Sequence, residues 1–435
     1  MKKIFLFINI LFVAIAAFSQ ETVYPAKPQS EKITIINATI HVGNGTVISN
    51  GYVVFENGKI TAVGEGSTNA GGKTIDAKGK HVYPGLIQSI SQLGLVEVNS
   101  VRATIDHTEL GTYNPNIRSV VAYNTDSKVI NTLKSNGILL VNIVPQGGII
   151  SGSSSVVQLD AWNWEDATYK ADGQIHLNMP SLFYRPNPFG GFRGQADTRT
   201  PADVVKEGLD KVEQTKAFFR EAKAYFKETA HTKINLKFES VKGLFDKKQK
   251  LFVHCDVVRE MLVAIDFAKE FGFDVVLVGA SESWQIADLL KQNNIAVILA
   301  ERHALPTMAD DDVDLPYKSA TYLQNAGVLF AITDEDGQTR GRNLSFNAGT
   351  AAAYGITKEQ ALSSITLNAA KILGIDNTTG SIETGKDANI VISDGDILDM
   401  KSSNVSYAFI QGREVNLDNK QKQLYERYKY KYGIK

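Results

Sequence analysis

The 435-residue sequence contains a single cysteine, Cys255. One thiol cannot form an intrachain disulfide, and it leaves no cysteine pair for a structural zinc site. The net charge is −1, which gives no electrostatic basis for binding nucleic acid or an acidic membrane surface. Hydrophobic residues make up 43% and charged residues 21% of the chain, which is the composition of a folded protein rather than a disordered one.

Long apolar runs are scarce, and one of them opens the chain. Residues 4–18 are mostly apolar, follow Lys2 and Lys3, and end in small residues. This run is shorter than the roughly 20 residues that cross a bilayer, and its basic start is typical of a secretory signal peptide over residues 1–19. We therefore expect a mature chain that begins near Gln20, has no membrane span, and is periplasmic or secreted. A retained membrane anchor is the alternative.

The middle of the chain, residues 84–375, alternates strand-like and helical segments. Four clean pairs are predicted: a strand at 250–255 with a helix at 257–271, then 274–280 with 283–292, 295–301 with 317–326, and 328–335 with 345–354. A helix over 358–373 follows. This alternation predicts an α/β fold, a (β/α)8 TIM-like barrel. Residues 94–200 are less regular, and barrel strands two to four are left unassigned there.

Short strands with alternating hydrophobicity occur at both ends of the chain, within residues 20–83 and 376–435. We expect the two ends to build one small β-sandwich domain beside the barrel. The basic, tyrosine-rich C-terminal segment reads as a solvated terminal helix rather than a nucleic-acid site.

The segment Tyr83–Gln92 reads YPGLIQSISQ: a Pro-Gly entry, an apolar run and polar residues at its end. These features suit the first strand of the barrel, whose carboxyl end faces the active-site side. The segment resembles the strand-one signature of amidohydrolases, in particular their imidazolonepropionase-like branch, which reads Pro-Gly-Leu-Ile-Asp-x-His-x-His. In this chain Gln88 stands at the aspartate position, and Ile90 and Gln92 stand at the two metal-binding histidines. Residues 366–374 and 380–389 resemble the C-terminal signature of the same family.

The resemblance implies a hydrolase that acts on a C–N bond, other than a peptide bond, in a small amide or cyclic amide. Its chemistry would use one divalent metal, most often zinc, to polarise the carbonyl and lower the pKa of a bound water. His254 matches the strand-five ligand. Asp334 matches the strand-eight aspartate, which is both ligand and catalytic base. Strand six ends without a histidine, and His303 after strand seven could bring a further imidazole. The predicted metal ligands are therefore His254, His303 and Asp334.

Other readings stay open. A single histidine near a strand end is often only a hydrogen-bonded rim residue. The substitutions Ile90 and Gln92 favour a second hypothesis, a catalytically silent amidohydrolase-like protein that binds a ligand or pairs with an active relative through residues 94–200. Such a chain could also form a homo-oligomer. A solute-binding protein is a third reading. Glu97 and His107 are further candidates for the site, and residues 310–314 form a carboxylate-rich loop that is typically solvated.

Overall fold

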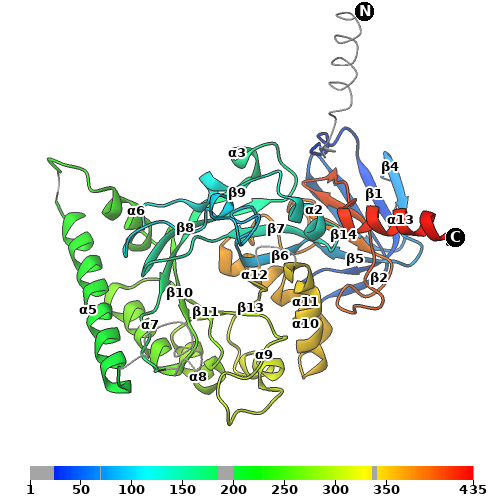
Figure 1. Ribbon diagram of the computed structural model, residues 1–435. Coiled ribbons are helices and arrows are strands. Elements are labelled where there is room, and N and C mark those ends of the chain that lie inside the picture. Colours follow the sequence, from blue (N-terminus) through cyan, green and yellow to red (C-terminus); the bar gives the residue numbers. More distant parts are fainter. Residues whose placement is uncertain (1–23, 69, 185–198, 229, 336–339, 435) are drawn as a thin grey trace, which may run out of the picture.

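The computed structural model describes residues 24–68, 70–184, 199–228, 230–335 and 340–434 (Figure 1). Two eight-stranded sheets make up its β-structure. The predicted signal peptide, residues 1–19, lies outside the described residues. Within those ranges, no helix combines the length and the apolar character that a bilayer crossing requires.

The smaller sheet is built from both ends of the chain, as the sequence predicts. The strand order is β16-β15-β14-β5-β1-β2-β3, with β4 paired to β1. Asn57 and Gly58 connect β2 and β3 with positive φ angles of 52° and 78°, which the tight hairpin turn predicted between these strands requires. The strands are β1 (Ile33–His41), β2 (Val47–Glu56), β3 (Lys59–Glu65), β4 (Lys73–Asp76), β5 (His81–Pro84), β14 (Ile390–Ser393), β15 (Val405–Ile410) and β16 (Arg413–Glu414).

The larger sheet is a nearly closed barrel, which confirms the predicted fold class. Its strands follow one another in chain order. The Thr333 hydroxyl links the first and last strands: it accepts from the Ile90 N–H and donates to the Ile90 carbonyl, both at 3.1 Å. The strands are β6 (Leu86–Ser91), β7 (Ile138–Ile143), β8 (Ile150–Gln158), β9 (Thr168–Asn178), β10 (Lys250–Cys255), β11 (Val275–Gly279), β12 (Ala296–Leu299) and β13 (Phe330–Ile332).

The barrel departs from strict β/α alternation in the region that the sequence left unassigned. Strand β8 is antiparallel to both β7 and β9. Gly147 and Gly148 have φ angles of 87° and 62°. Residues other than glycine rarely adopt this left-handed backbone conformation. The chain therefore turns straight back after β7, and no helix separates β7 from β8.

Helices surround the barrel and close one end of it. The predicted helix over 358–373 divides at Thr366 into α11 and α12. Lysines from two strands donate to the last carbonyls of α12: Lys250 Nζ to Ile372 O at 2.8 Å and Lys170 Nζ to Leu373 O at 2.9 Å. Positive charge at a helix C-terminus is favourable, so this pair fixes α12 across the floor of the barrel.

The helices are α2 (Lys128–Lys134), α3 (Trp164–Ala167), α5 (Pro201–Tyr225), α6 (Leu236–Phe245), α7 (Val258–Phe271), α8 (Ala287–Gln292), α9 (Leu315–Asn325), α10 (Leu344–Ala353), α11 (Lys358–Ser364), α12 (Leu367–Leu373) and α13 (Lys420–Tyr432). Short 3-10 segments are η1 (Arg102–Thr104), η2 (Ser119–Ala122), η3 (Ser283–Ile286) and η4 (Arg340–Asn343).

Candidate functional site

A cavity of about 510 Å³ opens at the carboxyl ends of the barrel strands. Met179 follows β9, His254 lies at the end of β10, Asp256 follows it, Gly279 ends β11, and Glu335 follows β13. Polar side chains at the carboxyl ends of barrel strands are where TIM-barrel active sites lie. This cavity, here called the mouth cavity, is therefore the candidate active site.

A chain of neutral hydrogen bonds runs through the barrel from α12 to the mouth cavity. Gln174 Nε2 donates to Leu373 O at 3.2 Å, and the Ser154 hydroxyl donates to Gln174 Oε1 at 2.8 Å. His176 Nε2 lies 2.8 Å from Ser154 Oγ, and His176 Nδ1 lies 2.9 Å from His254 Nε2. We call these four side chains, Gln174, Ser154, His176 and His254, the neutral chain.

The direction of these bonds assigns the histidine tautomers. Because the Ser154 proton is directed to Gln174, His176 Nε2 must carry the proton that it shares with Ser154. Neutral His176 is then an acceptor at Nδ1, so His254 donates from Nε2. Burial lowers the pKa of His254 to about 4 and that of His176 well below its ordinary value. Both rings are therefore neutral at pH 7, and His254 keeps a lone pair only at Nδ1.

The strand-eight aspartate is paired with an arginine. Asp334 is buried, and its Oδ1 accepts from Arg340 Nε at 3.0 Å. Asn347 Nδ2 lies 3.4 Å from Asp334 Oδ2. Arg340 also reaches Glu301 at 3.2 Å. The next residue, Glu335, has its pKa raised to about 7, first by burial and then by neighbouring carboxylates, while the charge of Arg340 lowers it.

The strand-one positions form part of the packed barrel. Ile90 is 1% exposed, and its backbone is held by Thr333. Gln88 is fully buried, and its amide donates to the Asp334 carbonyl. Gln92 is partly buried. The Gln88 side chain and the Ile90 backbone therefore tie strand one to the end of strand eight.

The other sequence candidates lie elsewhere. His303 is exposed, and its Nε2 lies 2.7 Å from Thr350 Oγ1 on α10. Glu97 accepts from Asn124 at 2.9 Å, and His107 contacts its neighbour Thr108. Among the residues that the structure describes, no three histidine, cysteine, aspartate or glutamate side chains come together as a metal-binding group. The structure does not assemble His254, His303 and Asp334 into one site, and a metal role for any of them stays a prediction.

The donor set at the mouth does not fit the metal that the family resemblance implies. Ile90 has no donor atom, and the Nε2 of His254 is protonated and bonded to His176. The Asp334 carboxylate already faces the positive charge of Arg340. A metal would have to displace these bonds.

Sequence reasoning missed His176, Glu335 and Arg340. His176 lies in β9, one of the strands left unassigned. Gln174 and His176 are two residues apart, so they face the same side of a strand. That spacing was the available signal that the two side chains share a face, but it could be used only once Thr168–Asn178 were known to form a strand. Glu335 gains its raised pKa from burial and from the carboxylates around it, and Arg340 is placed by its ion pairs with Asp334 and Glu301.

Comparison with known proteins agrees with this architecture. The amidohydrolase family model matches residues 280–415. Imidazolonepropionase of Picrophilus torridus is 32% identical over 181 residues, 39% of this chain and 43% of that protein. Imidazolonepropionase of Staphylococcus saprophyticus is 25% identical over 371 residues, 81% of this chain and 85% of that protein. The match to amidohydrolase tasK of Hapsidospora irregularis spans 35% of its length, so the first relatives are matched over less than half of their sequences.

Among solved structures, the amidohydrolase of Thermotoga maritima superposes with a TM-score of 0.71 and 28% identity, covering 88% of this chain and 99% of that one. The barrel, its mouth cavity and the sheet from both chain ends define a barrel protein of the amidohydrolase type. In sequence and fold the chain is similar to proteins of the amidohydrolase family, imidazolonepropionases among them.

Proposed function

We propose that this chain is a hydrolase that cleaves a C–N bond, other than a peptide bond, in a small amide or cyclic amide held in the mouth cavity. Similarity to amidohydrolases and imidazolonepropionases supports the reaction class. The observation that carries the proposal is the cavity itself, in which His254, Asp256 and Glu335 face one space of about 510 Å³ at the carboxyl ends of the strands. That volume suits a small organic substrate.

Glu335 is the group best suited to move the proton. A carboxyl group with a pKa of about 7 is partly ionised at neutral pH, so it can both accept and return a proton. Glu335 takes a proton from water as the water oxygen bonds to the carbonyl carbon. The proton then passes to the nitrogen as the C–N bond breaks, giving an acid and an amine. His254 lines the same cavity as a neutral imidazole whose Nδ1 is the remaining acceptor.

The test is hydrolysis of simple amides, lactams and hydantoins by the full chain after treatment with EDTA. Removing the Glu335 proton acceptor with Glu335→Gln is expected to lower kcat/KM about 100-fold or more, while Glu221→Gln on the exposed face of α5 leaves it unchanged. The rate of the unaltered protein should rise through about pH 7 as Glu335 ionises. Activity that survives in Glu335→Gln would contradict this role.

A second function is favoured by the packed strand-one positions and by the Asp334–Arg340 ion pair. In that case the chain is a catalytically silent member of the family that binds a small amide or pairs with an active relative. Calorimetric titration of the same amides separates the two functions: binding without release of an acid selects the silent protein, and turnover excludes it.

Metal binding, export of the chain and its assembly into a homo-oligomer are also proposals. Elemental analysis of the purified chain, with His254→Gln for comparison, tests for a bound zinc. The N-terminal sequence of mature protein tests removal of residues 1–19; a blocked or intact Met1 would contradict export. Size-exclusion chromatography with light scattering distinguishes a monomer from a homo-oligomer.

A further inference from the structure

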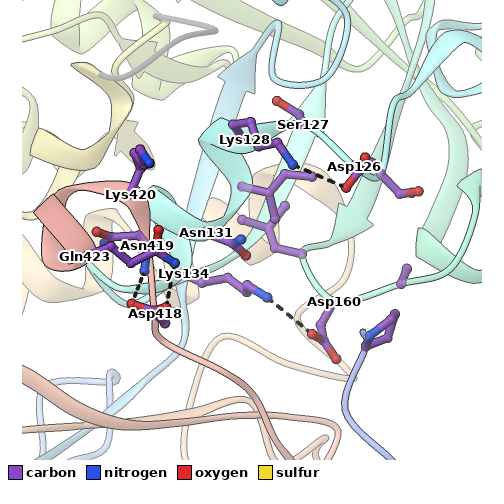
Figure 2. Close-up of a pocket in the computed structure, with 15 residues that line it drawn as sticks. Asp126, Ser127, Lys128, Asn131, Lys134, Asp160, Asp418, Asn419, Lys420 and Gln423 are labelled. Carbon is purple, nitrogen blue, oxygen red and sulfur yellow. Dashed lines mark hydrogen bonds and ion pairs between the residues drawn. The ribbon is translucent and has the colours of Figure 1, made fainter. Parts of the chain in front are cut away.

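A second cavity has a volume of about 520 Å³, and Figure 2 shows the side chains that line it. It lies at the opposite end of the barrel from the mouth. It is bordered by α2, by the segment after β8 and by the start of α13. Strand β7 begins at Ile138, just after α2, and the end of β8 pairs beside it, with Leu140 opposite Gln158. This floor cavity is therefore separate from the proposed active site, and the inference drawn from it does not depend on the proposed function.

Lys134 and Asp160, which line the floor cavity, belong to a buried cluster of charges whose third member, Arg413, lies behind the lining. Lys134 Nζ lies 3.3 Å from Asp160 Oδ1, and Arg413 Nη1 lies 3.0 Å from Asp160 Oδ2. The side chains of Lys134 and Asp160 are 3% and 2% exposed. Two cations thus share one carboxylate, which leaves a positive charge uncompensated in this cluster. An uncompensated buried charge is costly, so a bound anion would be strongly favoured.

Lys134 has hydrogen-bonding capacity to spare. An ammonium group has three N–H donors, and in the described part of the chain Lys134 Nζ makes one hydrogen bond, the 3.3 Å contact with Asp160. The side-chain amide of Asn131, one helical turn earlier, makes no hydrogen bond to any described residue and lines the same cavity. Figure 2 shows Lys134 reaching toward Asp160, with Asn131 beside it.

The rest of the lining completes a site for a small amphipathic molecule. Lys420 stands at the exposed rim. The carboxylate of Asp418 is engaged locally by the Asn419 N–H and the Gln423 amide, both at 2.9 Å. Ile130 and Leu159 line the cavity from buried positions. The cavity therefore offers a buried cation at one wall and apolar contacts beside it.

We propose that the floor cavity binds a small organic carboxylate, with its anionic group on Lys134 and Asn131 and its apolar body against Ile130 and Leu159. The volume of about 520 Å³ lies in the range of small-ligand sites. A carboxylate bound to an ammonium forms a charge-assisted hydrogen bond, stronger than one between neutral groups. Burial lowers the pKa of Lys134 while Asp160 raises it, and a second anion would further favour the charged lysine.

The test uses the full mature chain and three probes in calorimetric titration: hexanoate, the neutral analogue hexanol, and inorganic phosphate. Hexanoate is expected to bind more tightly than either of the others. Lys134→Met leaves Asp160 paired with Arg413 and should weaken hexanoate binding about tenfold or more. Lys431→Gln, which removes a charge from α13 outside the cavity, should leave binding unchanged.

Equal binding of hexanoate by Lys134→Met, or tighter binding of hexanol or phosphate, would overturn the proposal. If Lys134→Met does not fold, Asn131→Leu removes the other polar contact from a partly buried position, and undiminished binding by that variant would overturn the proposal equally. His254→Gln, at the mouth, should bind hexanoate as the unaltered protein does. Loss of binding there would place the ligand at the mouth and not at the floor.

Discussion

Two buried polar clusters hold the barrel, and they are stabilised in different ways. Inside the barrel, the neutral chain of Gln174, Ser154, His176 and His254 carries no charge, because burial keeps both imidazoles deprotonated. Below the barrel, Lys134, Asp160 and Arg413 are joined by ion pairs. We call these three residues the charged cluster.

The difference shows what each cluster requires of its surroundings. The neutral chain depends on the direction of its bonds, since each donor must meet an acceptor, and it joins strands β8, β9 and β10. The charged cluster depends on charge balance, and it joins α2, the segment after β8 and the small sheet. The neutral chain fixes His254, which lines the mouth cavity. The charged cluster links the two sheets.

The largest expected effect is the loss of the shared carboxylate. Asp160→Asn leaves Lys134 and Arg413 buried without a counter-ion, and we expect a loss of about 3–5 kcal/mol in the free energy of unfolding. Urea unfolding measures it. Asp126→Asn, at an exposed residue that lines the same cavity, should change the value by less than about 0.5 kcal/mol. Equal effects of the two substitutions would show that the charged cluster is accessible to water.

The neutral chain should respond to acid. His254 has a pKa of about 4 in the folded protein, below the value of about 6.5 for an unfolded chain. Its contribution is complete above pH 6.5 and is lost as the pH falls toward 4, because the unfolded chain takes up the proton first. The expected loss is about 3 kcal/mol. Urea unfolding at several pH values between 7 and 4 measures it.

His254→Gln provides the matched control for this pH dependence. A glutamine amide can still donate to His176 Nδ1 but does not titrate. The slope of unfolding free energy against pH should become flatter in this variant. An unchanged slope would mean that other groups carry the acid sensitivity.

A smaller effect is expected from Ser154→Ala, which removes the acceptor for His176 and the donor to Gln174. Leaving buried polar atoms without partners costs about 1–3 kcal/mol. Adding His176→Leu removes one of those atoms, so the double variant should lose less stability than the sum of the two single variants. Strict additivity in a double-mutant cycle would contradict the hydrogen bond between them.

The neutral chain and the charged cluster show which parts of the structure can be predicted from the sequence. The repeats β10 to β13 have clear apolar runs and helices, and the sequence places His254 and Asp334 at the ends of strands. Strand β8 runs antiparallel to both β7 and β9, and no helix separates β7 from β8, so the β/α pattern gives no frame for His176. Lys134, Asp160 and Arg413 are 26 and 253 residues apart along the chain, and only the folded sheets bring them together. Neither the pairing of Asp334 with Arg340 nor the raised pKa of Glu335 has a local sequence signal.

The smallest expected effect concerns salt, and it tests how well the charged cluster is isolated from solvent. Exposed charges are screened over about 3 Å in 1 M salt, whereas buried pairs are screened much less. The stability difference between the unaltered protein and Asp160→Asn should therefore change by less than about 0.5 kcal/mol between low salt and 1 M NaCl. Guanidinium is itself a salt, so urea must be the denaturant. If salt removed most of this stability difference, water and ions would be reaching Lys134. The charged cluster would then differ from the neutral chain in its exposure to solvent and not in its charge.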